Sequence, residues 1–221
     1  MNPVILFDMD GVLMNTEVLH YAIWQQVFAE RGLTIDFERY KGCIGSTNAR
    51  LMELIYEGYG VDFRGDESVI QRFSQLNQEH IRLHGVPPIE GVAQTLAQLK
   101  TRGYRMAVAS SSSRKNIEMC LQSLQIQHFF EVLFSAEQVA RPKPAPDVFL
   151  AAAAAMDAPP ETCVVVEDST AGVAAGRAAG MRVLGVDRNQ RAPQDFAGCE
   201  WLVHDLSELD VHAVFGDSDD R

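Results

Sequence analysis

The sequence predicts an α/β protein in which a doubly wound parallel sheet carries an inserted α-helical cap domain. Two observations support this prediction. Short runs of Val, Leu and Ile alternate with helical patterns, and continuous apolar runs are typical of parallel strands that are covered on both faces. Residues 16–86, between the first two such runs, contain helical patterns only, which is far more chain than one crossover between parallel strands requires.

The strands are predicted from apolar runs that end in polar or small residues, and a helical pattern follows most of them. The predicted strands are 4–8, 105–110, 131–135, 163–168, 182–187 and, with the weakest pattern, 200–205. The predicted helices of the sheet domain are 90–103, 114–125, 145–158 and 171–180. The first of these helices ends in basic residues and a glycine, as helix C-termini commonly do.

The helical insertion is predicted to contain three helices. They cover 16–32 with Thr16 as N-cap, 46–60 with Ser46 or Thr47 as N-cap, and 66–85. The proline-containing segment 86–91 is a candidate hinge. The expected division is therefore a core of residues 1–15 and 87–221 and a cap of residues 16–86.

Composition limits the classes of function. The net charge of −11 and the pI near 4.9 argue against a nucleic-acid or anionic-membrane surface, although a local cationic site can still bind a small anion. No apolar run approaches the length of a membrane span, and the N-terminus lacks the pattern of a signal peptide, so we expect a cytoplasmic protein. Four scattered cysteines predict neither a zinc site nor disulfides. Residues 216–221 are expected to form a frayed acidic tail, and the oligomeric state cannot be predicted.

Six polar residues have the same kind of location: each lies at the carboxyl end of a predicted strand or in the loop that follows that strand. Ligands of open parallel sheets bind at this edge. Each residue alone has an ordinary explanation as a helix cap, a loop side chain or a surface acid, but together they supply the parts of one reaction, phosphoryl transfer. These residues are Asp8, Asp10, Ser110, Lys143, Glu167 and Asp168.

The chemistry assigns a role to each group. Mg²⁺ prefers hard oxygen ligands, which Asp8, Glu167 and Asp168 can supply, and the metal would offset the cost of burying carboxylates together. Asp8 can attack phosphorus to form an aspartyl-phosphate, and Asp10 can protonate the leaving oxygen and then deprotonate water. Lys143 and the Ser110 hydroxyl would stabilise charge on the transferring oxygens.

Four segments resemble the motifs of the haloacid-dehalogenase-like phosphohydrolases, namely "DMDGV", "VASSSS", "RPKPAPD" and "VVVEDSTAGVAAGRAAGM". The resemblance extends to the branch with a helical cap, which includes β-phosphoglucomutase and many sugar-phosphate phosphatases. It implies a Rossmann-like core with Asp8 as nucleophile and Asp10 as acid and base, the latter also lending its backbone carbonyl to Mg²⁺. It places the substrate phosphate at Ser110, Ser111 and Lys143, and the metal at Glu167 and Asp168 as well.

We therefore expect a Mg²⁺-dependent phosphatase that acts on a small phosphorylated metabolite, a sugar or polyol phosphate, through an aspartyl-phosphate. One alternative is a β-phosphoglucomutase, which interconverts β-glucose 1-phosphate and glucose 6-phosphate. Its cap arginine, three residues after a cap glycine, corresponds here to Asn48, with Arg50 two residues later, and its cap lysine has no counterpart in 66–84. Another alternative is a receiver-like switch, for which a cap has no use. His20 is either a packed helix residue or a substrate contact. Asn48 and Arg50 are further candidate contacts between the cap and the substrate.

Overall fold

The computed structural model describes residues 3–43, 47–188 and 193–215, and its centre is one parallel sheet of six strands. The strand order is β3-β2-β1-β4-β5-β6, so the direction of winding reverses between β1 and β4. This confirms the predicted doubly wound α/β fold. The strands are β1 (Val4–Phe7), β2 (Arg105–Ser110), β3 (Val132–Ser135), β4 (Cys163–Glu167), β5 (Arg182–Val186) and β6 (Trp201–Val203).

The register of the central strands brings their carboxyl ends level. Phe7, the last residue of β1, pairs with Val108 of β2 on one side and with Val166 of β4 on the other. All four residues of β1 are buried, as expected for a strand covered on both faces. The residues that follow β1, β2 and β4 are consequently neighbours at one edge of the sheet.

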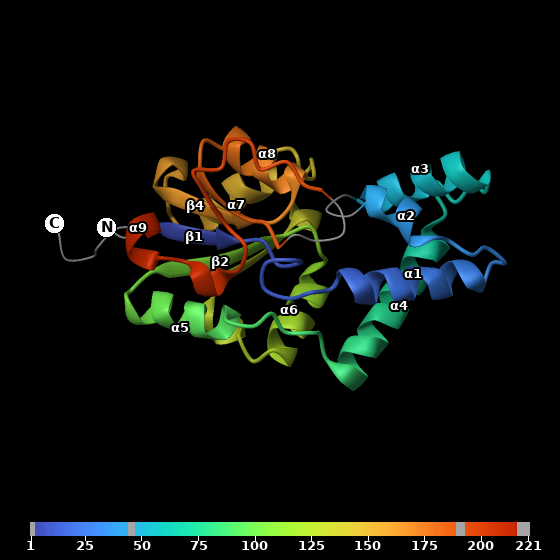
Figure 1. Ribbon diagram of the computed structural model, residues 1–221, viewed down its shortest axis with the longest axis horizontal. Helices are drawn as coiled ribbons and strands as arrows, with labels where there is room; N and C mark the ends of the chain where they lie inside the picture. Colours follow the sequence, from blue (N-terminus) through green and yellow to red (C-terminus); the bar gives the residue numbers. More distant parts are fainter. Residues whose placement is uncertain (1–2, 44–46, 189–192, 216–221) are drawn as a thin grey trace.

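Helices cover both faces of the sheet and enclose two apolar layers (Figure 1). One layer contains buried residues of α5 (Val92–Thr101), α6 (Arg114–Ser123) and the short α9 (Val211–Phe215). The other contains buried residues of α7 (Asp147–Ala155) and α8 (Thr170–Ala178). Within the described ranges, no helix combines the length and apolar character that a membrane span requires.

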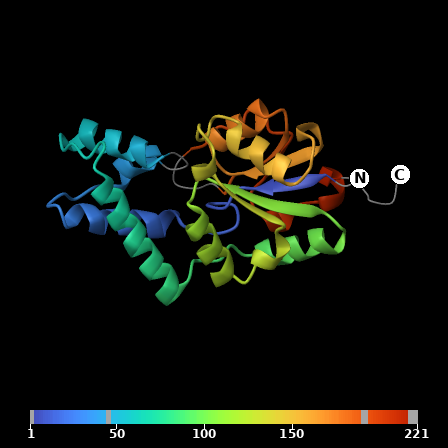
Figure 2. The same cartoon turned by 180° about the vertical axis from the view of Figure 1, so that it is seen from behind.

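A second group of helices lies beyond the carboxyl ends of the strands, at the far side of the molecule from α9 (Figures 1 and 2). It has its own apolar core, in which the indole of Trp24 stacks on Phe73 and Phe28 with ring centroids 4.3 and 5.4 Å apart. We call this group the cap. Its helices are α1 (Glu17–Ala29), α2 (Phe37–Tyr40), α3 (Asn48–Tyr59) and α4 (Glu67–His84).

The chain enters and leaves the cap through two connections that lie side by side. Met14 and Pro88 form an antiparallel β-bridge, and the backbone N–H of Asn15 donates to the carbonyl of Pro87 at 3.2 Å. The domain boundaries expected at residues 15 and 87 fall at this pairing. That the core and the cap are separate domains stays a prediction.

The start of the first cap helix differs from the expectation. Thr16 occupies the N-cap position of α1, but its side chain makes no capping hydrogen bond and its hydroxyl donates to Asp10 instead. Thr47 does cap α3, accepting from the N–H of Arg50 at 3.3 Å. The alternative cap Ser46 and the predicted tail 216–221 lie outside the described residues. The short helices α2 and α9 were not predicted.

Candidate active site

The ammonium of Lys143 joins the ends of three strands. It donates to Oδ1 of Asp8 at 2.5 Å, to Oε1 of Glu167 at 2.7 Å and to the carbonyl of Ala109 at 3.3 Å. Asp8 follows β1 directly and is itself tied to β4, since its N–H donates to the carbonyl of Val166 at 2.9 Å. One buried cation therefore holds two carboxylates that are far apart in the sequence.

Glu167 is held by further hydrogen bonds at its second oxygen. Oε2 accepts from the N–H groups of Asp168 and Ser169 and from the Ser169 hydroxyl, each at 2.9 Å. Ser169 also caps α8, accepting from the N–H of Gly172 at 3.1 Å. A Cβ on Gly172 would lie 1.7 Å from Oε1 of Glu167, so only glycine lets the first turn of α8 approach this carboxylate. Both oxygens of Glu167 are thus engaged by protein donors.

The electrostatic balance of the site is negative. Burial raises the pKa of Asp8 to about 7; the charges of Glu167 and Asp10 add to this effect and Lys143 opposes it. Burial, with the charges of Glu167, Asp8 and Asp10, also raises the pKa of Asp168 well above its usual range. Burial by itself would lower the pKa of Lys143, but the charges of Asp8 and Glu167 outweigh it and raise that pKa. One ammonium faces four acidic groups.

The oxygen donors at this edge fit a hard divalent cation such as Mg²⁺. Asp168 lies against the turn that follows Asp10. A Cβ added to Gly11 (φ +83°) in that turn would be only 1.7 Å from Oδ2 of Asp168. Over the part of the chain that the structure describes, no group of three His, Cys, Asp or Glu side chains is arranged to hold a metal ion. The Lys143 ammonium lies between two of the candidate ligands, Asp8 and Glu167. Glu167 already accepts hydrogen bonds at both carboxylate oxygens, and its part in metal binding stays a prediction.

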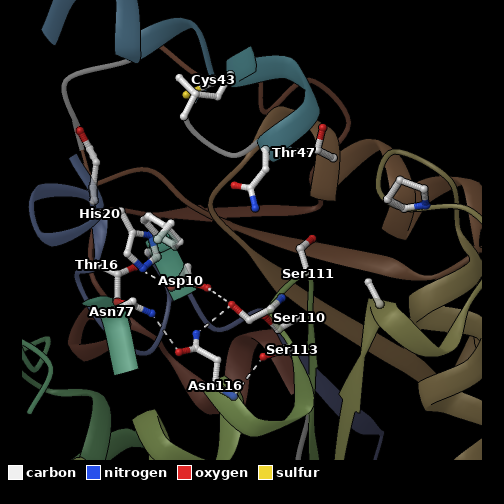
Figure 3. A pocket seen from close by; sticks show the side chains of 18 of the residues that line it. Asp10, Thr16, His20, Cys43, Thr47, Asn77, Ser110, Ser111, Ser113 and Asn116 are labelled. Carbon is white, nitrogen blue, oxygen red and sulfur yellow. Dashed lines mark hydrogen bonds between the residues drawn. The ribbon is translucent and has the colours of Figure 1, made fainter. Parts of the chain in front are cut away.

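The carboxylate of Asp10 accepts hydrogen bonds from two hydroxyl groups. Thr16 Oγ1 donates to Oδ1 at 2.5 Å, and Ser112 Oγ donates to Oδ2 at 3.2 Å. Thr16 lies at the entry to the cap, and Ser112 lies in the loop after β2. Asp10 is therefore oriented from the cap connection on one side and from the core on the other (Figure 3).

A cavity of about 460 Å³ lies between the core and the cap. Each of the seven core residues predicted for the site lines it, so the structure brings together groups from four segments of the sequence. Their chemical roles stay predictions. The seven are Asp8, Asp10, Ser110, Ser111, Lys143, Glu167 and Asp168.

The predicted cap residues divide into two kinds. His20 and Asn48 line the cavity, and the ring of His20 also packs edge-on against Phe73 with centroids 5.4 Å apart. Burial lowers the pKa of His20, against the opposing effect of Asp10. Arg50 is not among the described residues that line the cavity. Its guanidinium donates instead to Glu53 at 3.0 Å and to Glu57 at 3.3 Å.

Several cavity residues were not predicted, among them Thr16, Ser112, Asn116 and Asn77. One signal in the sequence could have identified Asn77. It occupies the buried row of α4 in which every fourth residue faces inward, together with Val69 and Ile81, and a polar side chain in such a row is unusual.

Comparison with known proteins agrees with this geometry. Residues 5–186 match the family described as haloacid dehalogenase-like hydrolase. Protein CbbY of Rhodobacter capsulatus is 31% identical over 95% of this chain and 96% of its own length. Fructose-1-phosphate phosphatase YqaB of Escherichia coli is 33% identical over 82% of this chain and 95% of its own. Beta-phosphoglucomutase of Bacillus subtilis is 28% identical over 95% and 92%, respectively.

Solved structures show the same arrangement of elements. CbbY from Rhodobacter sphaeroides in complex with phosphate superposes with a TM-score of 0.82 at 28% identity, covering 95% of this chain and 97% of that one. A variant of that protein in complex with xylulose-(1,5)bisphosphate has a TM-score of 0.76 at 29% identity, with the same coverage. The family match spans most of the sequence and includes every core residue predicted for the site. The chain therefore belongs to the haloacid dehalogenase-like hydrolases and is a phosphatase-like enzyme of that family.

Proposed function

We propose that this protein is a Mg²⁺-dependent phosphatase that hydrolyses a small sugar or polyol phosphate through an aspartyl-phosphate on Asp8. The observation that carries this proposal is the hydrogen bond between the Lys143 ammonium and Asp8, in a cavity that Asp10 also lines. A buried carboxylate beside a fixed cation suits attack on a phosphate ester, because the cation attracts the anionic substrate and stabilises developing negative charge.

In the first step, an oxygen of Asp8 attacks phosphorus and the ester oxygen departs. We assign the attack to Oδ2, since Oδ1 accepts the hydrogen bond from Lys143. Asp10 gives its proton to the departing oxygen, so that the product leaves as a neutral alcohol. Ser110, Ser111 and Lys143 line the cavity where the phosphoryl oxygens would lie.

In the second step, water attacks the phosphorus of the aspartyl-phosphate. Asp10, now ionised, accepts a proton from that water, and inorganic phosphate is released with the Asp8 carboxylate restored. A Mg²⁺ ion held by Asp8, Asp168 and the backbone carbonyl of Asp10 would neutralise the negative charge of the phosphate and the clustered carboxylates. Glu167, through its hydrogen bond to Lys143, fixes the ammonium beside Asp8.

The cap favours hydrolysis over phosphate migration within a bound sugar. A mutase must hold the second phosphate of a bisphosphate intermediate, and Arg50 is the cap cation suited to that task. Its guanidinium is exposed and already paired with Glu53 and Glu57, away from the cavity lining. The polar lining at Asn48 and His20 suits hydroxyl groups rather than a second phosphate.

The names of similar proteins support a sugar phosphate as the substrate class. One relative is named a fructose-1-phosphate phosphatase, and one structural neighbour was solved with xylulose-(1,5)bisphosphate. A cavity of about 460 Å³ is within the usual range of small-molecule sites. The cytoplasmic location expected from the sequence stays a prediction.

The test is a phosphate-release screen over sugar, polyol and nucleotide phosphates, with Mg²⁺ and with EDTA. We expect release from sugar or polyol phosphates that requires the metal and is abolished in Asp8→Asn. The same preparation is assayed for conversion of β-glucose 1-phosphate to glucose 6-phosphate. Conversion without phosphate release would establish the mutase alternative, and release that persists in Asp8→Asn would refute the aspartyl-phosphate.

A further inference from the structure

A buried pair of amides joins the cap to the core. The Nδ2 group of Asn77 on α4 donates to Oδ1 of Asn116 on α6 at 3.0 Å. Asn77 is only 4% exposed and Asn116 only 9%. Each of these amides gives up its hydration at the interface, so their hydrogen bond must offset a substantial desolvation cost.

The hydrogen bonds continue from this pair to the acidic centre. Asn116 Nδ2 donates to Ser112 Oγ at 3.2 Å, and Ser112 Oγ donates to Oδ2 of Asp10 at 3.2 Å. Every donor points the same way, from the cap towards the carboxylate. Figure 3 shows the amide of Asn77 directed at Asn116, with further dashed lines leading on to Asp10. We call Asn77, Asn116 and Ser112 the relay.

Adhesion between cap and core does not explain this arrangement. Over the described part of the chain, no protein donor reaches the buried Oδ1 of Asn77, so the two buried amides gain one hydrogen bond between them. Apolar side chains at positions 77 and 116 would join the two helices without that cost. The distinguishing property of the relay is that it ends on the side chain assigned to proton transfer.

We propose that the relay residues are positioning residues, which couple the seating of the cap on the core to the orientation of the Asp10 carboxylate. When α4 rests against α6, Asn77 fixes Asn116, Asn116 fixes the Ser112 hydroxyl, and Ser112 holds Oδ2 of Asp10. Thr16 acts separately, on the other oxygen. The inference rests on the proposed function, because it assigns to Asp10 the proton delivered to the leaving alcohol.

A misdirected general acid has a distinctive kinetic effect. An alkyl phosphate needs its leaving oxygen protonated, whereas 4-nitrophenyl phosphate releases a stable phenolate and needs little help. The value of kcat/KM reports only the steps through formation of the aspartyl-phosphate, before Asp10 acts as a base. The measured quantity is therefore the ratio of kcat/KM for two substrates, the alkyl phosphate that the wild type cleaves fastest in the screen and 4-nitrophenyl phosphate.

The variants remove the relay at its two ends. Ser112→Ala is expected to lower the ratio roughly three- to tenfold, the range expected for one lost hydrogen bond. Ser112→Thr keeps a hydroxyl group and is expected to have a ratio close to that of the wild type. Asn77→Ala is expected to lower the ratio by a similar factor, and to have no additional effect in the Ser112→Ala background. Lys115→Ala is the matched control. It removes another bond between the same two helices, from Lys115 Nζ to Gln78 Oε1 at 2.7 Å, and should leave the ratio unchanged.

The outcomes separate the relay from other roles. Equal losses for both substrates would show a merely structural effect and overturn the inference, as would effects of Asn77→Ala and Ser112→Ala that multiply in the double variant. Melting temperatures identify any variant that is unfolded, and the Ser112→Ala and Ser112→Thr pair tests the last link without altering the cap. A wild type that cleaves neither ester would refute the proposed function itself, and the relay with it.

Discussion

Replacement of Lys143 by methionine tests the electrostatic core of the site. The side chain of Lys143 is 5% exposed, and the side chains of its partners Asp8 and Glu167 are 11% and 1% exposed. Removing the cation leaves two buried carboxylates without their shared counter-charge, and breaking a buried pair in this way costs about 3–5 kcal/mol. Arg141→Met is the matched control. The distance from Arg141 to Asp147 is 2.7 Å, equal to that from Lys143 to Glu167, but the Arg141 side chain is 69% exposed. Such surface pairs contribute about 0–1 kcal/mol.

The loss should depend on pH in a defined direction. In the folded protein the pKa of Asp8 is raised to about 7 from an ordinary value of 3.8, so the folded state binds this proton more tightly than the unfolded state. Its charge therefore opposes folding above pH 7, and the penalty disappears as the pH falls through 7 towards 3.8. Without Lys143 the penalty is larger, so Lys143→Met should lose more stability at pH 8 than at pH 5.

The assay is urea unfolding followed by circular dichroism in EDTA at pH 8 and pH 5. We expect the destabilisation of Lys143→Met at pH 8 to shrink by at least about half at pH 5, while Arg141→Met stays close to wild type at both. A Lys143→Met protein as stable as the wild type at pH 8, or equally destabilised at both pH values, would refute this account of the site.

Three further predictions follow from the same geometry. Gly172→Ala places a methyl group against Glu167 and should cost about 1–3 kcal/mol of unfolding free energy, measured by urea denaturation, and lower phosphate release. Asp10→Asn should lower kcat by about 10²–10⁴-fold. Its Mg²⁺ affinity by calorimetry should change by less than about threefold, because a backbone carbonyl is the expected ligand; parallel losses would contradict that role. Mg²⁺ should raise the melting temperature more at pH 8 than at pH 5.5, since protons compete for Asp8 and Asp168, and a pH-independent shift would contradict metal binding there.

Much of the core could be predicted because its signals are local. Buried strands appear in the sequence as apolar runs, and the observed strands end within one or two residues of the predicted limits. Asp8, Ser110 and Glu167 stand where such runs end, so their convergence follows from a parallel sheet with level strand ends. The site residues of the core were accessible to sequence reasoning for this reason.

The remaining features depend on contacts between distant parts of the chain. Lys143 was predicted at the site, but nothing local shows that its ammonium donates directly to Asp8, 135 positions away. Thr16 follows the local rule for an N-cap, but a charged acceptor, Asp10, competes successfully for its hydroxyl. The four-residue helix α2 is too short to display a helical period. Asn77 and Asn116 acquire a partner only when cap and core meet.

The paired connections between core and cap have a mechanical consequence. If the two connections were separate flexible tethers, the cap could twist and slide relative to the core. The β-bridge between Met14 and Pro88 joins the two tethers into one narrow two-stranded ribbon. Such a ribbon bends most easily across its flat face, so rotation is largely confined to a single axis. A cap that rotated about this axis would bring α4 back to the same place on α6. Lengthening only one of the two tethers, by inserting residues beside Gly85, would free the other directions of movement without replacing any side chain of the chemistry.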